Sequence, residues 1–281
     1  MRASLDSQLE RRALVCPLTH DPLKRAGDVL RSATHSYPII NGVPVFVDRV
    51  EQDSPMALEY AAPRERFAWL KYWLRRSDYR TKRSIAALNR VLDVPPESLC
   101  ISIGGGPLRA SEQFLNLNIG LFQNVDVVGD AHRLPYADES IDAVHSEAVF
   151  EHLHSPTVAA RELARVLKPG AHAYVCTPFL QPFHGYPSHF QNFTETGHRR
   201  LFEDAGLDVV ESGVCVGPMM TMLQLGRTFC DTFLPRVLRP LSRAAYLVGR
   251  LALAPFDRIL GERDDAYVMA CTTYLVARKR E

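Results

Sequence analysis

Hydrophobic and polar positions follow two different periods in the first third of the chain. Short apolar runs flank Asn41 and Gly42, two residues that tolerate a positive φ, which predicts a β-hairpin within a small β-rich module over residues 1–50. Beyond this module, apolar side chains recur at helical spacing among arginines and lysines until two prolines interrupt the pattern. We therefore expect an amphipathic helical linker or lid over residues 51–97.

Over residues 98–281, apolar strand-like segments alternate with helical ones. This alternation is typical of an α/β domain, in which a mostly parallel sheet carries helices on its faces. The predicted strands span residues 99–103, 113–119, 125–129, 141–146, 171–177, 208–216 and 268–278. Helices are expected over 156–167 and 196–205, and an apolar helical insertion over 219–262 precedes the last strand, which we place antiparallel at the edge of the sheet.

Composition narrows the class of protein. Hydrophobic residues make up 46% of the 281 residues and charged residues 23%, which is typical of a globular protein and not of a disordered one. The formal net charge of +1 argues against a protein held on nucleic acid by phosphate contacts. We see no signal peptide and no apolar run long enough to span a membrane, and the six scattered cysteines fit buried thiols in a reducing compartment. The expected location is the cytoplasm.

A glycine-rich turn is the first candidate for chemistry. The predicted strand that begins at Leu99 runs directly into Gly104, Gly105 and Gly106, and glycines at such a turn let backbone N–H groups approach a ligand closely. The same sequence also fits a tight turn without a ligand. The dinucleotide fingerprint G-x-G-x-x-G is incomplete because position 109 is arginine, which disfavours a nicotinamide-dependent oxidoreductase.

Several motifs further along occur in one recognisable order and spacing. They are Gly129-Asp130-Ala131-His132-Arg133-Leu134-Pro135-Tyr136, Asp138-Glu139-Ser140-Ile141-Asp142, Glu151-His152-Leu153, Leu167-Lys168-Pro169-Gly170 and Thr177-Pro178. Over roughly residues 98–212 this run resembles class I S-adenosylmethionine-dependent methyltransferases, especially the methyltransferase type 11 subgroup. The resemblance implies a Rossmann-like, seven-stranded, mostly parallel sheet with helices on both faces. It also implies S-adenosylmethionine as the cofactor and methyl transfer to an O, N or C atom of an acceptor, which we expect to be a small molecule.

The resemblance implies a set of cofactor contacts as well. In the family, the position of Asp130 accepts a hydrogen bond from the adenine amino group, and the N–H at the position of Ala131 meets an adenine ring nitrogen. Asn118 stands where an acidic residue normally holds the ribose hydroxyls, and an amide can still accept one hydrogen bond and donate another. The implied cofactor-binding residues are Gly104, Gly105, Gly106, Asn118, Asp130, Ala131 and Glu147.

Departures from the family pattern support a different hypothesis. Ser102 replaces the usual aspartate of the first strand, and Leu108 replaces the third glycine. The segment from Gly106 to Asp130 is shorter than usual, so we expect the first helix of the domain to be truncated. The alternative is therefore a catalytically inactive, methyltransferase-like protein that acts as a partner or scaffold.

The loop over residues 178–194 is rich in aromatic residues, prolines and histidines, and it follows a predicted strand, so we expect it to cover the acceptor. The candidate substrate-binding residues are Phe183, Tyr186 and Phe190. His184 and His189 are candidate general bases, because histidine titrates near neutral pH, although each histidine can instead hydrogen-bond within the loop. A nearby group has no known metal-binding spacing, so no metal site is predicted; its members are His145, Glu147, Glu151, His152 and His154.

The two ends of the chain suggest partners. Cys16-Pro17-Leu18-Thr19 together with 37–44 is similar to the zinc-ribbon-like activator subunit of tRNA and protein methyltransferases, but a single cysteine cannot build a tetrahedral zinc site. We expect the module to bind no metal and to pack against the catalytic domain. The insertion over 219–262 combines apolar helix faces with arginines, which fits either a cap over the site, a peripheral membrane or lipid-binding surface, or a homodimer interface.

Overall fold

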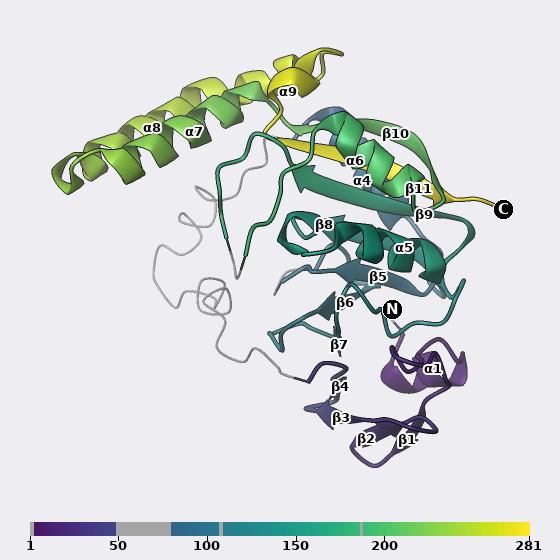
Figure 1. Cartoon of the computed structure of the whole chain (residues 1–281). Helices are drawn as coiled ribbons and strands as arrows, with labels where there is room; N and C mark the ends of the chain where they lie inside the picture. The colour runs from purple at the N-terminus through teal and green to yellow at the C-terminus, as the bar shows by residue number, and fades with distance from the viewer. Residues whose placement is uncertain (1–2, 49–79, 107–108, 186–187) are drawn as a thin grey trace.

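The structure, a computed structural model, describes residues 3–48, 80–106, 109–185 and 188–281. It contains a small four-stranded sheet near the N-terminus and a seven-stranded sheet in the body of the molecule (Figure 1). Most of the predicted helical linker, residues 51–79, lies outside the described residues, as do Leu108 and Tyr186.

The small module begins with helix α1 (Leu5–Glu10) and continues with four antiparallel strands. The strands are β1 (Lys24–Ala26), β2 (Val29–Arg31), β3 (Ser36–Ile40) and β4 (Val43–Pro44). Asn41 and Gly42 form the turn between β3 and β4 with φ values of 52° and 81°, which is the geometry that a tight hairpin requires. The predicted hairpin is confirmed.

The module and the body share one hydrophobic core. Val45 forms a parallel bridge with Val128, and the backbone N–H of Phe46 donates to the carbonyl of Val128 at 2.8 Å. Leu14 bridges to Tyr136, and both side chains are buried in the same cluster. The module therefore extends the outer side of the large sheet instead of hanging from it as a separate body.

The large sheet is built from seven strands. They are β5 (Cys100–Ile103), β6 (Phe114–Asn118), β7 (Val127–Val128), β8 (Ile141–Glu147), β9 (Leu167–Pro178), β10 (Leu207–Val216) and β11 (Thr272–Lys279). Their spatial order is β10-β11-β9-β8-β5-β6-β7, and β11 is antiparallel to both of its neighbours. The pairs formed by β5 to β9 are parallel, which confirms the predicted mostly parallel sheet.

One expectation about this sheet is wrong. The last strand, β11, lies between β9 and β10 and not at the edge. The reason is visible in the burial of the two strands: residues 273–277 of β11 are all buried, whereas β10 is half-exposed along most of its length. A strand that is buried on both faces belongs inside a sheet, and the more polar strand takes the edge.

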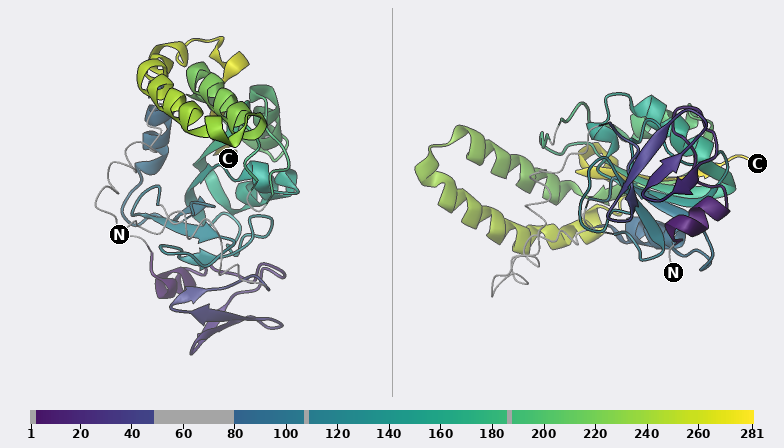
Figure 2. Two further views of the ribbon diagram at one scale, coloured as in Figure 1. Left: turned by 90° about the vertical axis from the view of Figure 1, so that its left-hand side faces the viewer. Right: turned by 90° about the horizontal axis from the view of Figure 1, so that it is seen from below.

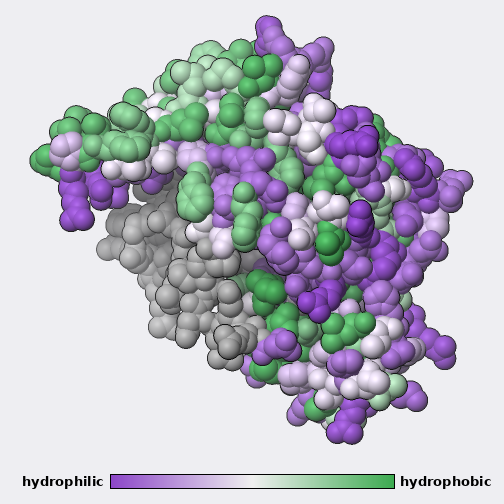
Figure 3. Space-filling view, viewed as in Figure 1, coloured by the Kyte–Doolittle hydropathy of each residue, from purple (hydrophilic) through white to green (hydrophobic). Residues whose placement is uncertain are grey.

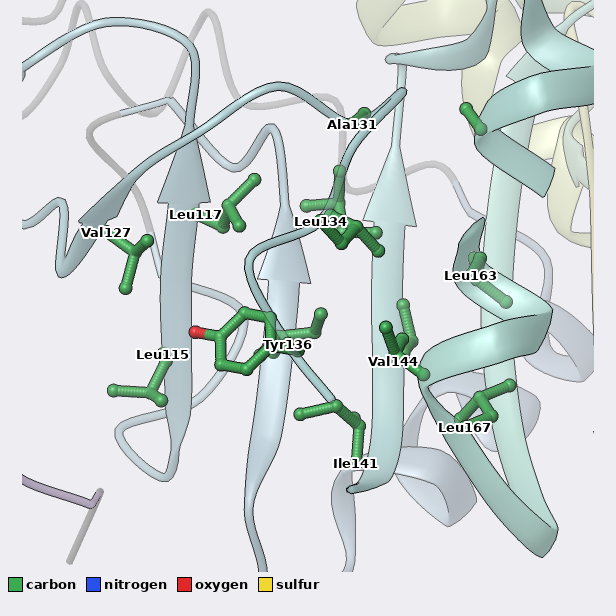
Figure 4. Packing of buried hydrophobic residues seen from close by; sticks show 14 of the residues in the cluster. Leu115, Leu117, Val127, Ala131, Leu134, Tyr136, Ile141, Val144, Leu163 and Leu167 are labelled. Atoms are coloured by element: carbon green, nitrogen blue, oxygen red, sulfur yellow. The ribbon is translucent and has the colours of Figure 1, made fainter. Parts of the chain in front are cut away.

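Helices cover both faces of the sheet. Helix α4 (Lys82–Leu92) buries Ala87 and Val91 on one face. Helices α5 (Pro156–Val166) and α6 (Glu195–Glu203) pack on the other face, where Leu163 and Phe202 are fully buried. Figure 4 shows Tyr136, Val144 and Leu163 gathered in this second core layer. Between β5 and β6 the described residues, 104–106 and 109–113, contain no helix, in agreement with the truncation that we expected.

The insertion before β11 forms an arm of two antiparallel helices, α7 (Pro218–Phe233) and α8 (Arg239–Leu253), which extends outward from the body (Figures 1 and 2). Helix α9 (Asp257–Leu260) returns the chain to the sheet. The buried carboxylate of Asp257 accepts hydrogen bonds from the N–H groups of Met219 and Met220 at 2.8 and 2.9 Å, which caps α7 and fixes the base of the arm. Short 3₁₀ turns complete the fold at Phe150–His152, Arg236–Leu238, Ala254–Phe256 and Ala266–Met269.

In the described part of the chain, no helix combines the length and the apolar character needed to cross a bilayer.

Candidate cofactor and acceptor site

The implied cofactor residues lie at one edge of the sheet. Glu147 ends β8, Gly104 follows β5, Asn118 ends β6 and Asp130 follows β7, and these four strands are neighbours in that order. Because the four strands are parallel, their carboxyl ends meet at the same side, which is where open α/β sheets bind ligands.

Asp130 presents a carboxylate that is held in place but accessible. Its Oδ1 accepts hydrogen bonds from the backbone N–H of His132 at 2.9 Å and from the ring Nδ1 of His132 at 2.7 Å. The Asp130 side chain is still 34% exposed. The adjacent N–H of Ala131 donates no hydrogen bond to any described residue. The pair therefore offers an acceptor and a donor side by side at the end of β7.

Asn118 connects two strands at this edge. Its backbone carbonyl accepts from the N–H of Gly129 at 2.8 Å, and its side-chain oxygen accepts weakly from the N–H of Gly120 at 3.4 Å. The side chain is 7% exposed. Because it is an amide, it can offer a ligand one acceptor and two donors but no negative charge.

The two outer glycines of the turn after β5 have different environments. Gly104 has φ +70°, and a Cβ at this position would lie 2.4 Å from Cγ2 of Val149, so Gly104 is required by packing. Gly106 has φ +57°, and a Cβ there would meet no atom within 4 Å. Its carbonyl is held by Nδ2 of Asn116 at 2.7 Å. Among the described residues, room for a Cβ is therefore found beside Gly106 and not beside Gly104.

Glu147 belongs to a chain of polar contacts that sequence reasoning missed in part. Both of its carboxylate oxygens accept from the guanidinium of Arg80 at 2.6 Å, and the ring of His145 lies 3.5 Å away. Nδ1 of His145 is bonded in turn to Oγ of Ser102 at 2.8 Å. Burial alone would raise the pKa of Glu147, but the contacts with His145 and Arg80 lower it to about 2. No motif marks Arg80, which lies 67 residues before Glu147 in the sequence.

These residues fit the implied cofactor. An accessible carboxylate beside an N–H without a partner in the described residues matches the edge of an adenine ring, and the described residues leave room for a Cβ beside Gly106. A hollow of about 900 Å³ elsewhere does not coincide with this edge; it lies between α1, the turn at Gly42 and the segment from Arg109 to Asp126.

The loop after β9 is tied to itself by its histidines. Nδ1 of His184 donates to the carbonyl of Pro182 at 3.0 Å. His189 has both ring nitrogens engaged, because Nε2 donates to Oδ1 of Asn192 at 2.6 Å and Nδ1 accepts from the backbone N–H of His184 at 3.2 Å. Both histidines thus form hydrogen bonds within the loop, which was the alternative to a role as general base. Their roles as bases stay predictions.

Two of the three aromatic residues that we expected to line a closed acceptor pocket are exposed to solvent. The side chains of Phe183 and Phe190 are 77% and 57% exposed. Phe183 stacks on the ring of His189, with the two centroids 5.5 Å apart. A substrate-binding role for these two residues stays a prediction, and Tyr186 cannot be placed.

The five histidines and glutamates for which no metal-binding spacing was recognised do not form one cluster. His145 and Glu147 belong to the chain with Arg80, and the ring of His154 packs on His132 with centroids 4.1 Å apart. Glu151 and His152 instead meet His184 from the loop. The neighbouring carboxylate of Glu151 raises the pKa of His184 against the opposing effect of burial.

Residues 108–175 match the methyltransferase domain family (Methyltransf_11). A stretch of 51 residues is 45% identical to the biotin biosynthesis bifunctional protein BioHC of Cellvibrio japonicus, covering 18% of this chain and 10% of the relative. A stretch of 71 residues is 41% identical to the demethylmenaquinone methyltransferase of Corynebacterium efficiens, covering 24% of this chain and 31% of the relative.

A solved structure resembles a larger part of the fold. It is a chain from the complex between the Trm112 methyltransferase activator of Haloferax volcanii and a methyltransferase. The TM-score is 0.50 at 17% identity, over 82% of this chain and 99% of that one. At this identity the likeness concerns the fold alone.

The chain spans a tenth and about a third of the lengths of the two curated relatives. The family match confirms the resemblance noted in the sequence and supports S-adenosylmethionine as the cofactor.

Proposed function

On the premise of this methyltransferase domain, we propose that the protein is an enzyme that transfers a methyl group from S-adenosylmethionine to an O, N or C atom of a small-molecule acceptor. The observation that carries the proposal is the accessible carboxylate of Asp130 beside the unengaged N–H of Ala131, at the carboxyl edge of a parallel sheet. The alternative, an inactive partner or scaffold, has no need of such a pair.

The residues of this chain would serve mainly to position the reactants. The cofactor, when bound, supplies an electrophilic methyl group on a sulfonium. Asp130 and Ala131 would hold the adenine, Asn118 would face the ribose, and the turn at Gly106 would receive the methionine part. Methyl transfer is an in-line displacement, so alignment and exclusion of water account for most of what a protein contributes.

Glu147 and Arg80 support this edge electrostatically. Because the pKa of Glu147 is about 2, the carboxylate is ionised at neutral pH and keeps Arg80 in place by two hydrogen bonds. The Arg80 side chain is 31% exposed, and its charge is paired with the carboxylate of Glu147 at the end of β8. We assign Arg80 a positioning role.

Calorimetric titration of the purified full chain with S-adenosylmethionine and with S-adenosylhomocysteine tests the proposal. We expect binding by the unmodified protein and a loss of about 1–3 kcal/mol of binding free energy in Asp130→Ala, as for the removal of a hydrogen bond to a charged acceptor. Asp28→Ala, in the small module, is the control and leaves the affinity unchanged. Failure of the unmodified protein to bind either compound at millimolar concentration overturns the proposal in favour of the scaffold, and equal affinity in Asp130→Ala removes Asp130 from the adenine site.

The helical arm supports a second part of the proposal, which is contact with an anionic membrane surface. Phe233, Val237 and Leu241, near the tip, are 72%, 80% and 69% exposed. Over residues 218–256 the sequence has five arginines and one acidic residue, Asp231, an excess of four positive charges. Apolar side chains cover much of the arm (Figure 3). Arginines beside exposed apolar residues on helices suit the headgroup region of a bilayer with anionic lipids.

A further inference from the structure

Glu151 is a fully buried carboxylate on the 3₁₀ turn after β8. Its exposed fraction is 0%, and neither of its carboxylate oxygens has a hydrogen-bond partner among the described residues. Taking an ionised carboxylate out of water is costly unless a positive group compensates for the lost hydration. The surroundings of Glu151 should therefore contain a cation, or the means to bind one.

Two imidazoles point at this carboxylate. Nε2 of His184 lies 3.6 Å from Oε1 of Glu151, and Nε2 of His152 lies 3.7 Å from the same oxygen. Both distances are longer than a hydrogen bond. The His184 and His152 side chains are 32% and 18% exposed, so the two rings are partly accessible while the carboxylate behind them is not.

The other nitrogen of each ring fixes its protonation. Nδ1 of His152 is 2.5 Å from the carbonyl of Ser188, and Nδ1 of His184 is 3.0 Å from the carbonyl of Pro182. A carbonyl can only accept, so Nδ1 carries the proton in both rings, and in the neutral rings each Nε2 presents a lone pair toward Glu151. Two nitrogen lone pairs facing a carboxylate repel it unless one of the rings is protonated or a metal cation lies between the groups, and a single metal ion satisfies both nitrogens at once.

From this arrangement we propose that Glu151, His152 and His184 bind a divalent first-row transition-metal ion, through one oxygen of Glu151 and Nε2 of each histidine.

The geometry is close to what such an ion requires. The three ligand atoms all lie within 4.8 Å of one another. Ligands at the usual bond lengths around a tetrahedral ion stand about 3.4 Å apart, so two of the three separations are already within a few tenths of an ångström. Metal-bound histidines generally donate their second N–H to a backbone carbonyl or a carboxylate, and both histidines here do so. Two histidines and one glutamate also leave a fourth position for water or a ligand oxygen.

This inference differs from the expectation of no metal site. The sequence places His145, Glu147 and His154 beside Glu151 and His152, but the fold engages those three elsewhere and brings His184 from a loop 33 residues away. The site is also independent of the proposed methyl transfer, because its residues can be tested for metal binding without any cofactor.

The test is metal titration of the full chain, purified without a histidine tag and treated with EDTA. Calorimetry with ZnCl₂ and visible absorption with CoCl₂ are the two readouts, both in the absence of S-adenosylmethionine. We expect one ion per chain and the absorption bands of four-coordinate cobalt with nitrogen and oxygen ligands.

Two variants and a control identify the ligands. Glu151→Gln and His184→Ala should each weaken binding by about 100-fold or more, since removal of even an outer partner costs 10–100-fold. Glu151→Gln also removes the buried charge while conserving shape, so this variant remains folded without metal. His189→Gln is the control, because its ring lies 4.4 Å from that of His184 but both of its nitrogens are engaged. It should bind zinc as the unmodified protein does.

Three results would overturn the site. They are the absence of stoichiometric binding to the unmodified protein, equal affinity in Glu151→Gln, and a sulfur-to-cobalt charge-transfer band that shows binding at a cysteine. Each of these leaves the titration with S-adenosylmethionine unaffected, so a failure here is distinguishable from a failure of the proposed methyl transfer.

Discussion

His198 is a buried histidine that couples folding stability to pH. It lies on α6 with 1% of its surface exposed, and its Nδ1 is 3.2 Å from Oγ1 of Thr273. Nε2 has no hydrogen-bond partner in the described residues. Burial disfavours the charged ring and lowers the pKa of His198 to about 3, against about 6.5 in an unfolded chain. The unfolded state therefore binds a proton more readily, and stability falls as the pH falls from about 6.5 toward 3.

We expect this histidine to remove about 2 kcal/mol from the free energy of unfolding between pH 7 and pH 5. Urea unfolding of the unmodified protein and of His198→Gln at both pH values measures it. The variant should be less stable at pH 7 but lose about 2 kcal/mol less on acidification.

Two other groups have shifted pKa values, but they do not affect the difference between the unmodified protein and His198→Gln. The pKa of Glu147 is lowered to about 2, so its contribution is lost only as the pH falls below about 4.5, outside the measured interval. The raised pKa of His184 acts in the opposite sense, since its contribution is present at low pH and lost as the pH rises. Both are common to the two proteins. An identical pH dependence in His198→Gln contradicts the assignment.

At the scale of residues, the sequence predicts the place of those candidate site residues that follow strands within recognisable motifs. Asp130, Asn118 and Glu147 are of this kind, because the end of a parallel strand fixes where a side chain lies. Arg80 and the approach of His184 to Glu151 could not be predicted, because each depends on a contact between segments 67 and 33 residues apart. A single sequence carries no signal for such a contact.

At the scale of elements, the predicted strands are all present, and the differences lie at their ends and in their order. Strand β9 begins at Leu167, four residues before the predicted start, because the chain passes from α5 directly into the strand and Leu167 already pairs with Ile141, ahead of a register shift. Strand β11 begins only at Thr272, since a 3₁₀ turn occupies 266–269. Hydrophobic patterns locate an element but do not give its neighbours, which is why the position of β11 was predicted wrongly.

The small module is predicted to unfold together with the body. Leu14 of the module is 1% exposed and lies in the core that it shares with the body. Leu14→Ala should reduce stability by about 2–5 kcal/mol, which is typical for a buried leucine. Differential scanning calorimetry should show one transition in the unmodified protein and one transition, at lower temperature, in the variant.

A second leucine of the module tests whether the loss of stability depends on burial of the side chain. Leu18 is 50% exposed, so Leu18→Ala should shift the transition by much less. A second, low-temperature transition that appears in Leu14→Ala while the main one stays fixed would show that the module and the body are independent folding units.

At the scale of the whole molecule, the arm and the candidate site face the same side. The carboxyl ends of β8 and β9 point toward the side from which α7 and α8 extend (Figure 1). The base of the arm is fixed to the body by Asp257, while its tip carries the exposed apolar residues. An arm held in this way can bring a membrane surface close to the loop over residues 178–194, which would suit an acceptor that partitions into lipid.

The exposed apolar residues and the arginines of the arm predict binding to an anionic membrane. We expect the full chain to sediment with vesicles that contain phosphatidylglycerol but not with pure phosphatidylcholine vesicles, and salt should weaken the binding because arginines contribute to it. Phe233→Ser combined with Val237→Ser should weaken binding about tenfold or more, since two exposed apolar side chains no longer enter the interface. Val210→Ser, on the half-exposed strand β10, is the control and should bind normally.

Light scattering of the lipid-free protein distinguishes the competing use of the same face. A monomer in solution agrees with the membrane surface, because the apolar residues of the arm are then uncovered until lipid is added. A stable dimer that the same double substitution dissociates, together with no vesicle binding, would instead assign the arm to contact between two copies of the chain. Vesicle binding that is equally strong for neutral and anionic lipid would contradict the part of the argument that rests on the arginines and leave only burial of the apolar residues.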